Sequence, residues 1–154
     1  MNLTEVPTEL IWPDMHYLFL ESSGPFSESA PKLWREFHSK HFPVLKADGY
    51  PISSVCSLYK LKPEQLYRAG VIVGAAPDTL ADGLSYEHVE GGKYACFTLT
   101  GSYSNLPQAC SRVFTLVNEL NFVLRDAFYI ENYVTDPTST PEEASVTQIL
   151  VPIA

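Results

Sequence analysis

Residues 16–27 read HYLFLESSGPFS and residues 93–104 read KYACFTLTGSYS, so the second stretch repeats the pattern of the first. In each stretch, a run of apolar and β-prone residues leads into a glycine, then an aromatic residue and a serine. The two glycines are 101 − 24 = 77 positions apart. The same spacing joins further identical pairs: Tyr17/Tyr94, Ser27/Ser104 and Phe37/Phe114. A constant spacing between identical residues indicates that the chain contains two copies of one unit.

The repeat continues toward the carboxyl end of each copy. Pro63-Glu64 aligns with Pro141-Glu142, and Val71-Ile72-Val73 aligns with Ile149-Leu150-Val151, at an offset of 149 − 71 = 78. We therefore place the internal repeats at about residues 14–76 and 85–153.

Periodicity predicts the same order of elements in both copies. A strand, at about 16–21 and 93–100, runs into a turn and then an amphipathic helix with apolar residues at three- and four-residue spacing. Ser27 and Ser104 are the expected helix N-caps, and Pro31 and Pro107 are expected in the first helical turns. Two more strands then complete each copy, at about 52–60 and 70–76 in the first, and at about 128–135 and 146–152 in the second.

These elements predict an α+β fold built from tandem duplicated β-α-β-β units. The sheet is expected to be mostly antiparallel with two helices on one side, and a pseudo-twofold axis should relate the copies. Residues 75–83 read as a short connector, and a single copy would leave one sheet face uncovered, so we expect one domain over residues 1–154. A cleft at the pseudo-twofold axis is the expected place for a ligand.

Composition narrows the classes of function. The 154 residues are 45% hydrophobic and carry 10 Lys+Arg against 18 Asp+Glu, a net charge of −8, which disfavours direct binding of nucleic acid. No apolar run reaches membrane-spanning length and the amino end lacks a signal-peptide pattern, so we expect a cytoplasmic protein, monomeric or dimeric, with no membrane contact. Cys56, Cys96 and Cys110 are an odd set without CxxC spacing, which favours reduced, buried thiols.

Conventional motifs for metals and cofactors are missing. His38 and His41 share a helix face, but no HExxH sequence or cysteine at ligand spacing accompanies them. There is no GxGxxG or P-loop sequence either. We therefore expect no metal and no cofactor.

The segment Phe128–Val134 is aromatic and β-branched, which indicates a strand. Side chains alternate along a strand, so Tyr129, Glu131 and Tyr133 share one face. An unpaired carboxylate in an apolar wall is costly, and it must be hydrogen-bonded, protonated or kept for a cation that arrives with a ligand. The alternative is that Glu131 is a solvated residue on a half-exposed strand. In the first copy the equivalent position is expected to be Ser53 or Ser54, so the carboxylate belongs to one copy only.

Other aromatic side chains are candidate walls for a ligand pocket, although most of them are expected to pack the sheet against the helices. Trp34 and Tyr50, near the end of the first helix and in the loop after it, are the candidates for a cavity mouth. The remaining candidates are Tyr17, Tyr59 and Phe97, together with Phe19 and Tyr103.

Four segments in this order resemble the GyrI-like small-molecule-binding family, which includes effector-binding domains of AraC-type and multidrug-responsive bacterial regulators. The segments are Val89–Ala95, Thr100–Tyr103, Phe128–Tyr133 and Pro141–Glu143. The resemblance implies a tandem SHS2-like fold with an aromatic cavity and an acidic residue inside it. The family's glutamate falls on Glu131 and its following tyrosine on Tyr133, whereas Ile130 stands where the family has an aromatic residue.

The resemblance covers nearly the whole chain, which is expected to be a stand-alone member. The leading hypothesis for its function is a binding protein for hydrophobic, aromatic and cationic small molecules, with Glu131 as counter-charge. The second hypothesis is a hydrolase of strained electrophiles of the cyclopropanoid type, in which Glu131 and Tyr133 are the catalytic residues. The third is a protein-interaction module like the gyrase-inhibiting members of the family.

Overall fold

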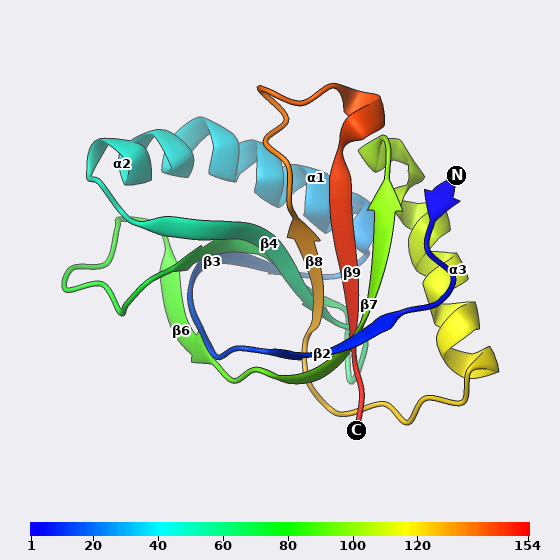
Figure 1. Ribbon diagram of the computed structural model, residues 1–154. Coiled ribbons are helices and arrows are strands. Elements are labelled where there is room, and N and C mark those ends of the chain that lie inside the picture. Colours follow the sequence, from blue (N-terminus) through cyan, green and yellow to red (C-terminus); the bar gives the residue numbers. More distant parts are fainter. The chain divides into compact units, whose positions relative to one another are not determined.

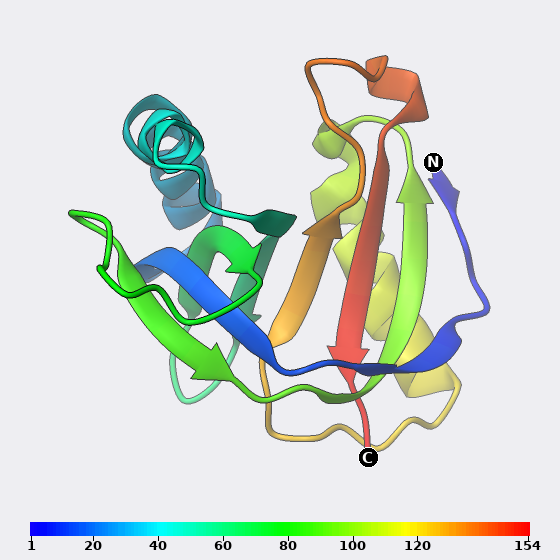
Figure 2. The ribbon, with the colours of Figure 1, turned by 60° about the vertical axis from the view of Figure 1, so that its left-hand side comes forward.

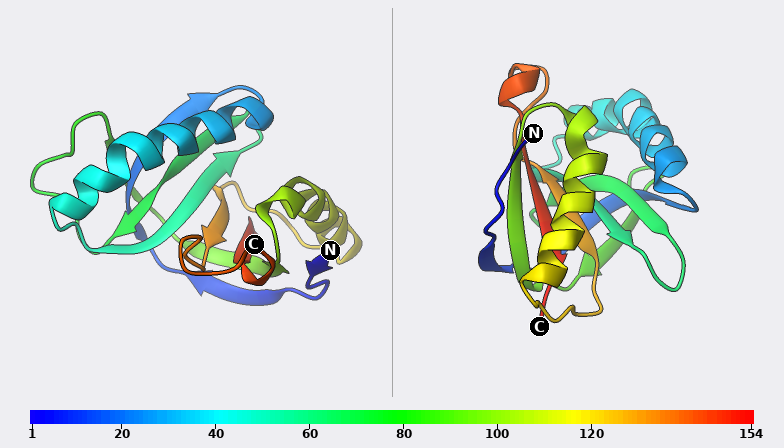
Figure 3. Two further views of the ribbon diagram at one scale, coloured as in Figure 1. Left: turned by 90° about the horizontal axis from the view of Figure 1, so that it is seen from above. Right: turned by 90° about the vertical axis from the view of Figure 1, so that its right-hand side faces the viewer.

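The computed structural model describes residues 1–154 and has the expected mixed α+β architecture (Figure 1). The chain divides into two compact units. One unit consists of Pro13–Gly91, and the other combines Met1–Trp12 with Gly92–Ala154. In each unit a helical segment packs on one face of an antiparallel sheet (Figure 3).

The Pro13–Gly91 unit has the strand order β4-β5-β3-β6. Its helical segment is continuous, because a π-helical turn (η1) links α1 to α2. Leu18 and Val71 of the sheet form a buried core with Phe37 and Leu45 of the helical segment. The elements are β3 (Met15–Ser23), α1 (Phe26–Glu36), η1 (Phe37–His41), α2 (Phe42–Ala47), β4 (Ile52–Lys60), β5 (Leu66–Val73) and β6 (Ser85–Val89).

In the other unit, β9 lies between β7 and β8, with β1 and β2 paired to the far side of β7 (Figure 2). Helix α3 packs on one face of this sheet, and its Val113 and Val117 are buried with Phe97 and Ile149. The elements are β1 (Asn2–Leu3), β2 (Thr8–Trp12), β7 (Gly92–Thr100), η2 (Tyr103–Asn105), α3 (Leu106–Glu119), β8 (Tyr129–Tyr133), η3 (Glu142–Ala144) and β9 (Val146–Pro152). No helix has the length and apolar character needed to cross a membrane.

Strands β2 and β6 are exchanged between the two repeats. Strands β2 and β6 begin 85 − 8 = 77 positions apart, which is the spacing of the repeat. However, β2 pairs with β7 of the second half of the chain and β6 pairs with β3 of the first half, so each strand joins the sheet formed by the other repeat. The exchange explains why Met1–Trp12 belongs to the unit formed by the second half of the chain.

The turn after the first long strand of each copy has the same conformation, and its hydrogen bonds correct the alignment of the last strands of the two copies. Gly24 and Gly101 both have positive φ, 108° and 127°, a conformation that favours glycine. Gly24 donates its N–H to the carbonyl of Gln65, and Gly101 donates to that of Ser145. These partners are 145 − 65 = 80 positions apart, so the offset of 78 expected for the last strands is wrong by two residues.

The expected helix starts need correction. Helix α1 begins at Phe26 after Pro25, so Ser27 lies inside the helix and Pro31 falls in its second turn. In the second copy a 3₁₀ turn precedes α3, and Ser102 caps it by accepting a hydrogen bond from the N–H of Ser104. Ser104 is therefore not the N-cap. Pro107 does lie at the start of α3, as expected.

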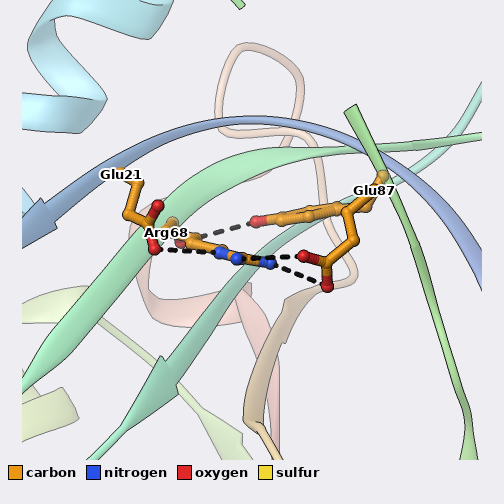
Figure 4. A network of polar contacts seen from close by, with 4 residues as sticks. Glu21, Arg68 and Glu87 are labelled. Carbon is orange, nitrogen blue, oxygen red and sulfur yellow. Dashed lines mark hydrogen bonds and ion pairs between the residues drawn. The ribbon is translucent and has the colours of Figure 1, made fainter. Parts of the chain in front are cut away.

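Figure 4 shows how the guanidinium of Arg68 links three strands of the Pro13–Gly91 unit. Arg68 of β5 donates two hydrogen bonds of 3.2 Å to Glu87 of β6, and its Nε lies 3.5 Å from a carboxylate oxygen of Glu21 on β3. The guanidinium also lies over the ring of Phe19, 4.1 Å from its centre. Charge pairing and cation–π contact together compensate for the burial of Arg68.

Candidate functional site

Glu131 is the central residue of the site, and both of its carboxylate oxygens are hydrogen-bonded. It lies in β8 opposite Ile149 of β9, on the sheet face that α3 covers. The hydroxyl of Tyr133 donates to Oε1 at 3.0 Å, and the thiol of Cys110 in α3 donates to Oε2 at 3.4 Å. The solvated alternative is therefore a poor description of this side chain, because a phenol and a thiol take the place of water.

The surroundings of Glu131 shift the ionisation of its carboxyl. Burial raises its pKa above the usual value, and the hydrogen bonds from Tyr133 and Cys110 lower it by less. Both donors are uncharged groups, and neither replaces the cation that a carboxylate taken out of water normally requires.

Aromatic rings lie beside the carboxylate on the same sheet face. Tyr133 meets Tyr103 edge to face with ring centres 5.6 Å apart, and Tyr129 meets Phe114 of α3 in the same way at 5.6 Å. Burial raises the pKa of the Tyr103 and Tyr129 hydroxyls, so both remain neutral donors near pH 7. The four rings provide flat, electron-rich surfaces of the kind that bind aromatic or cationic molecules.

Strand register identifies the counterpart of Glu131 in the other unit. Glu131 is opposite Ile149 and Ser57 is opposite Ala69, and Ala69 and Ile149 differ by the same 80 positions as the two turns. The counterpart is therefore Ser57, and the expectation of Ser53 or Ser54 is wrong. Tyr59 follows Ser57 by two residues, just as Tyr133 follows Glu131.

The Ser57 position is neutral and hydrogen-bonded to aromatic residues. The hydroxyls of Ser57 and Tyr67 lie 2.5 Å apart, and the indole N–H of Trp34 contacts both, at 3.1 Å and 2.8 Å. Phe26 packs edge to face on Tyr59 at 5.4 Å. The two units thus have a polar side chain at equivalent positions of β4 and β8, but only the one in β8, Glu131, is a carboxyl group.

The remaining aromatic candidates differ in accessibility. Tyr17 and Phe97 are fully buried, and Phe97 belongs to the core beneath α3. Tyr17 donates its hydroxyl proton to the carbonyl of Cys56 at 2.8 Å. Tyr50 is half-buried and donates to the carbonyl of Thr79 at 2.7 Å. Trp34 is half-buried as well, whereas Tyr59 is buried.

Sequence reasoning did not bring Cys110, which contacts Glu131, or Phe114, which contacts Tyr129, to the candidate site. Both lie on α3, and the rotation of a helix against a sheet is set by packing and not by periodicity alone. A hollow of about 320 Å³ lies nearby, and Tyr103, which touches Tyr133, is one of its lining residues. The other lining residues are polar or small: Ser102, Ser104, Pro137, Thr140, Glu142 and Ser145.

His38 and His41 lie in an aromatic cluster of the helical segment. His38 stacks on Phe42 with ring centres 5.0 Å apart, and His41 is buried against Phe37. Burial lowers the pKa of both imidazoles. No group of three or more His, Cys, Asp or Glu side chains is arranged to hold a metal ion.

The family comparison shows that the chain is a small-molecule-binding domain. The family model of the GyrI-like small molecule binding domain matches residues 7–154, and the chain belongs to this family. No curated protein is significantly similar in sequence.

Three solved structures illustrate the shared fold. SAV2435 bound to tetraphenylphosphonium is 12% identical with a TM-score of 0.78, over 96% of this chain and 93% of that one. The EcmrR C-terminal domain is 16% identical with a TM-score of 0.79, over 100% and 99%. A hydrolase from Listeria innocua is 12% identical with a TM-score of 0.61, over 97% and 92%.

Proposed function

We propose that this domain binds lipophilic aromatic cations, with Glu131 as the counter-charge. The observation that supports this most strongly is the carboxylate itself, which is held by neutral donors and has a pKa raised by burial. Holding such a group without a cation costs folding free energy. A ligand that supplies the positive charge recovers that cost on binding.

The rings of Tyr133, Tyr129 and Tyr103 are the proposed walls for the ligand. Phenol rings attract cations through their faces and also provide apolar area, so they suit molecules in which charge is surrounded by aromatic groups. Phe97 is proposed to support these walls from the core beneath α3, because its side chain is fully buried. Trp34, Tyr50, Tyr59 and Tyr17 belong to the Pro13–Gly91 unit, and they stay sequence-based predictions of ligand contacts.

The test uses tetraphenylphosphonium, the cation bound in the related fold of SAV2435. Thermal unfolding of wild type and Glu131→Gln is followed with this cation and with triphenylphosphine oxide, a neutral aromatic analogue. A cation at 100 times its dissociation constant adds about 2.7 kcal/mol, which moves the midpoint by roughly 5 to 10 °C for a chain of this size. The proposal requires this shift in wild type and its loss in Glu131→Gln.

A matched control separates a specific loss from general damage. Glu142→Gln removes a carboxylate from the polar hollow without touching Glu131. An equal loss of the shift in Glu142→Gln and Glu131→Gln would reject Glu131 as the counter-charge.

Hydrolysis of a bound electrophile is the second candidate, and the contact between Tyr133 and Glu131 favours it. A carboxylate with a raised pKa is a better general base at neutral pH than an ordinary one. The phenol of Tyr133, which is hydrogen-bonded to Oε1, is a proton donor. Product accumulating beyond one equivalent, and absent in Glu131→Gln, would establish an enzyme. Product limited to one equivalent or less would exclude turnover.

A further inference from the structure

The half-buried thiol of Cys110 lies in direct contact with the carboxylate of Glu131. The sulfur is 3.4 Å from Oε2, and the hydroxyl of Tyr133 is 3.0 Å from Oε1. The Glu131 carboxylate therefore contacts a nucleophilic sulfur through one oxygen and a hydroxyl proton donor through the other. This is the arrangement of a nucleophile activated by an adjacent base, with a third group holding the base in place.

The other two cysteines provide an internal comparison. Cys56 is fully buried, and burial raises the pKa of its thiol far above the usual range. Cys96 is also buried, with a pKa raised for the same reason. Neither thiol is hydrogen-bonded to a carboxylate, and buried thiols without a base are inert. Cys110 differs from both, because its thiol contacts a carboxylate that can act as a base.

We propose that Cys110 captures lipophilic α,β-unsaturated carbonyl compounds as thioethers, with Glu131 as proton acceptor. The inference rests on the proposed function in one respect, because the electrophile enters the same aromatic site. The rings of Tyr103 and Tyr133 select an apolar body, and the Cys110–Glu131 contact selects an electrophilic carbon. The domain then retains such neutral compounds covalently, whereas it retains lipophilic cations by charge.

The step is balanced within the site. The Cys110 sulfur forms a bond to the β-carbon of the electrophile while the thiol proton passes to Glu131. The π electrons of the carbon–carbon double bond move onto the carbonyl oxygen, giving an enolate that the Tyr133 hydroxyl is placed to hydrogen-bond. Glu131 then returns the proton to the α-carbon, so the product is a saturated thioether and no oxidant or reductant is consumed.

Glu131 has two opposite effects on the thiol, and they can be separated. As a fixed negative charge, a carboxylate disfavours the thiolate and slows alkylation. As a proton acceptor, it assists formation of the nucleophile in the reacting complex. Removing the carboxylate therefore speeds alkylation under the first description and slows it under the second.

The experiment measures adduct formation by intact mass with benzylideneacetone, a neutral lipophilic enone. Wild type is expected to gain one adduct, mapped to Cys110 by peptide mass, with Cys56 and Cys96 unmodified. Glu131→Gln should react at least tenfold more slowly, within the range of general base catalysis. Tyr133→Phe should show a smaller decrease, and the thermal midpoints of all variants confirm that they are folded.

Other outcomes overturn the inference. These are an unmodified Cys110, an adduct on all three cysteines at similar rates, or an equal or faster reaction in Glu131→Gln. Wild type itself separates this inference from the proposed function, because stabilisation by tetraphenylphosphonium and adduct formation with benzylideneacetone are measured independently on the same protein. Stabilisation without any adduct in wild type removes only the covalent step, whereas an adduct without stabilisation removes only the cation-binding function.

Discussion

The hydroxyl of Tyr133 donates a 3.0 Å hydrogen bond to the carboxylate of Glu131, two residues earlier on the same strand. This bond favours the ionised carboxylate and partly offsets the effect of burial on its pKa. Tyr133→Phe keeps the ring and removes the donor, so the pKa of Glu131 should rise above its wild-type value. Carbon-detected NMR titration of the side-chain carboxyl measures this. An unchanged or lower pKa would show that the phenol does not support the charge.

Glu131→Gln should make the protein more stable at neutral pH. The folded pKa lies above the usual value of 4.5, so between these two values the folded state holds a proton that the unfolded chain has lost. Stability therefore falls as pH rises through this window, and glutamine avoids the fall. The difference in free energy of unfolding between variant and wild type should grow as pH rises through this window and then level off. Urea titrations across this pH range measure it, and a variant destabilised equally at every pH would contradict it.

Gly70 lies where the backbone of β5 passes close to β3. A Cβ at this position would be 2.2 Å from the carbonyl oxygen of Leu18 and 2.9 Å from the ring of Tyr17. Gly70→Ala should lower the free energy of unfolding by about 3 kcal/mol, because two paired strands cannot separate without losing their hydrogen bonds. Gly74→Ala is the matched control, since nothing lies within 4 Å of its added Cβ. Similar thermal midpoints for the two variants would refute the close approach.

Arg68→Lys should destabilise the Pro13–Gly91 unit although it preserves the charge. The guanidinium side chain is 9% exposed, while its partners Glu21 and Glu87 are 39% and 45% exposed. Those carboxylates can be hydrated again, so we expect a modest cost of about 1 to 2 kcal/mol, from the lost two-pronged contact and the contact with Phe19. Chemical denaturation measures it against Arg35→Ala, an exposed control expected to change stability by less than about 0.5 kcal/mol. Equal effects of the two variants would rule out the structural role of Arg68.

Local patterns predicted the strands that carry their own signal. Residues 52–60 and 146–152 are observed as β4 and β9 with the expected limits, because their β-branched and aromatic residues are bounded by turns. Strands β2 and β6 were not expected. Their sequences are short and mixed in polarity, and each pairs with a strand of the other sequence repeat, which no local pattern reveals.

The candidate site was predicted in part for a similar reason. Alternation along β8 placed Glu131 and Tyr133 on one face, and the structure joins them by a hydrogen bond. The contact with Cys110 depends on how α3 is rotated against the sheet, and the equivalence with Ser57 depends on strand register. Register is fixed by turn lengths, which differ between the two copies, so an alignment by sequence alone shifted it.

The central claim, that Glu131 is a counter-charge for a bound cation, is tested most directly by its pKa with and without ligand. The measurement is an NMR titration of the Glu131 carboxyl in the free protein and in saturating tetraphenylphosphonium. The account predicts a pKa above the usual value in the free protein and a lower pKa when the cation is bound, because an adjacent positive charge favours the carboxylate. A pKa that is the same in both states, with the cation demonstrably bound, would contradict it.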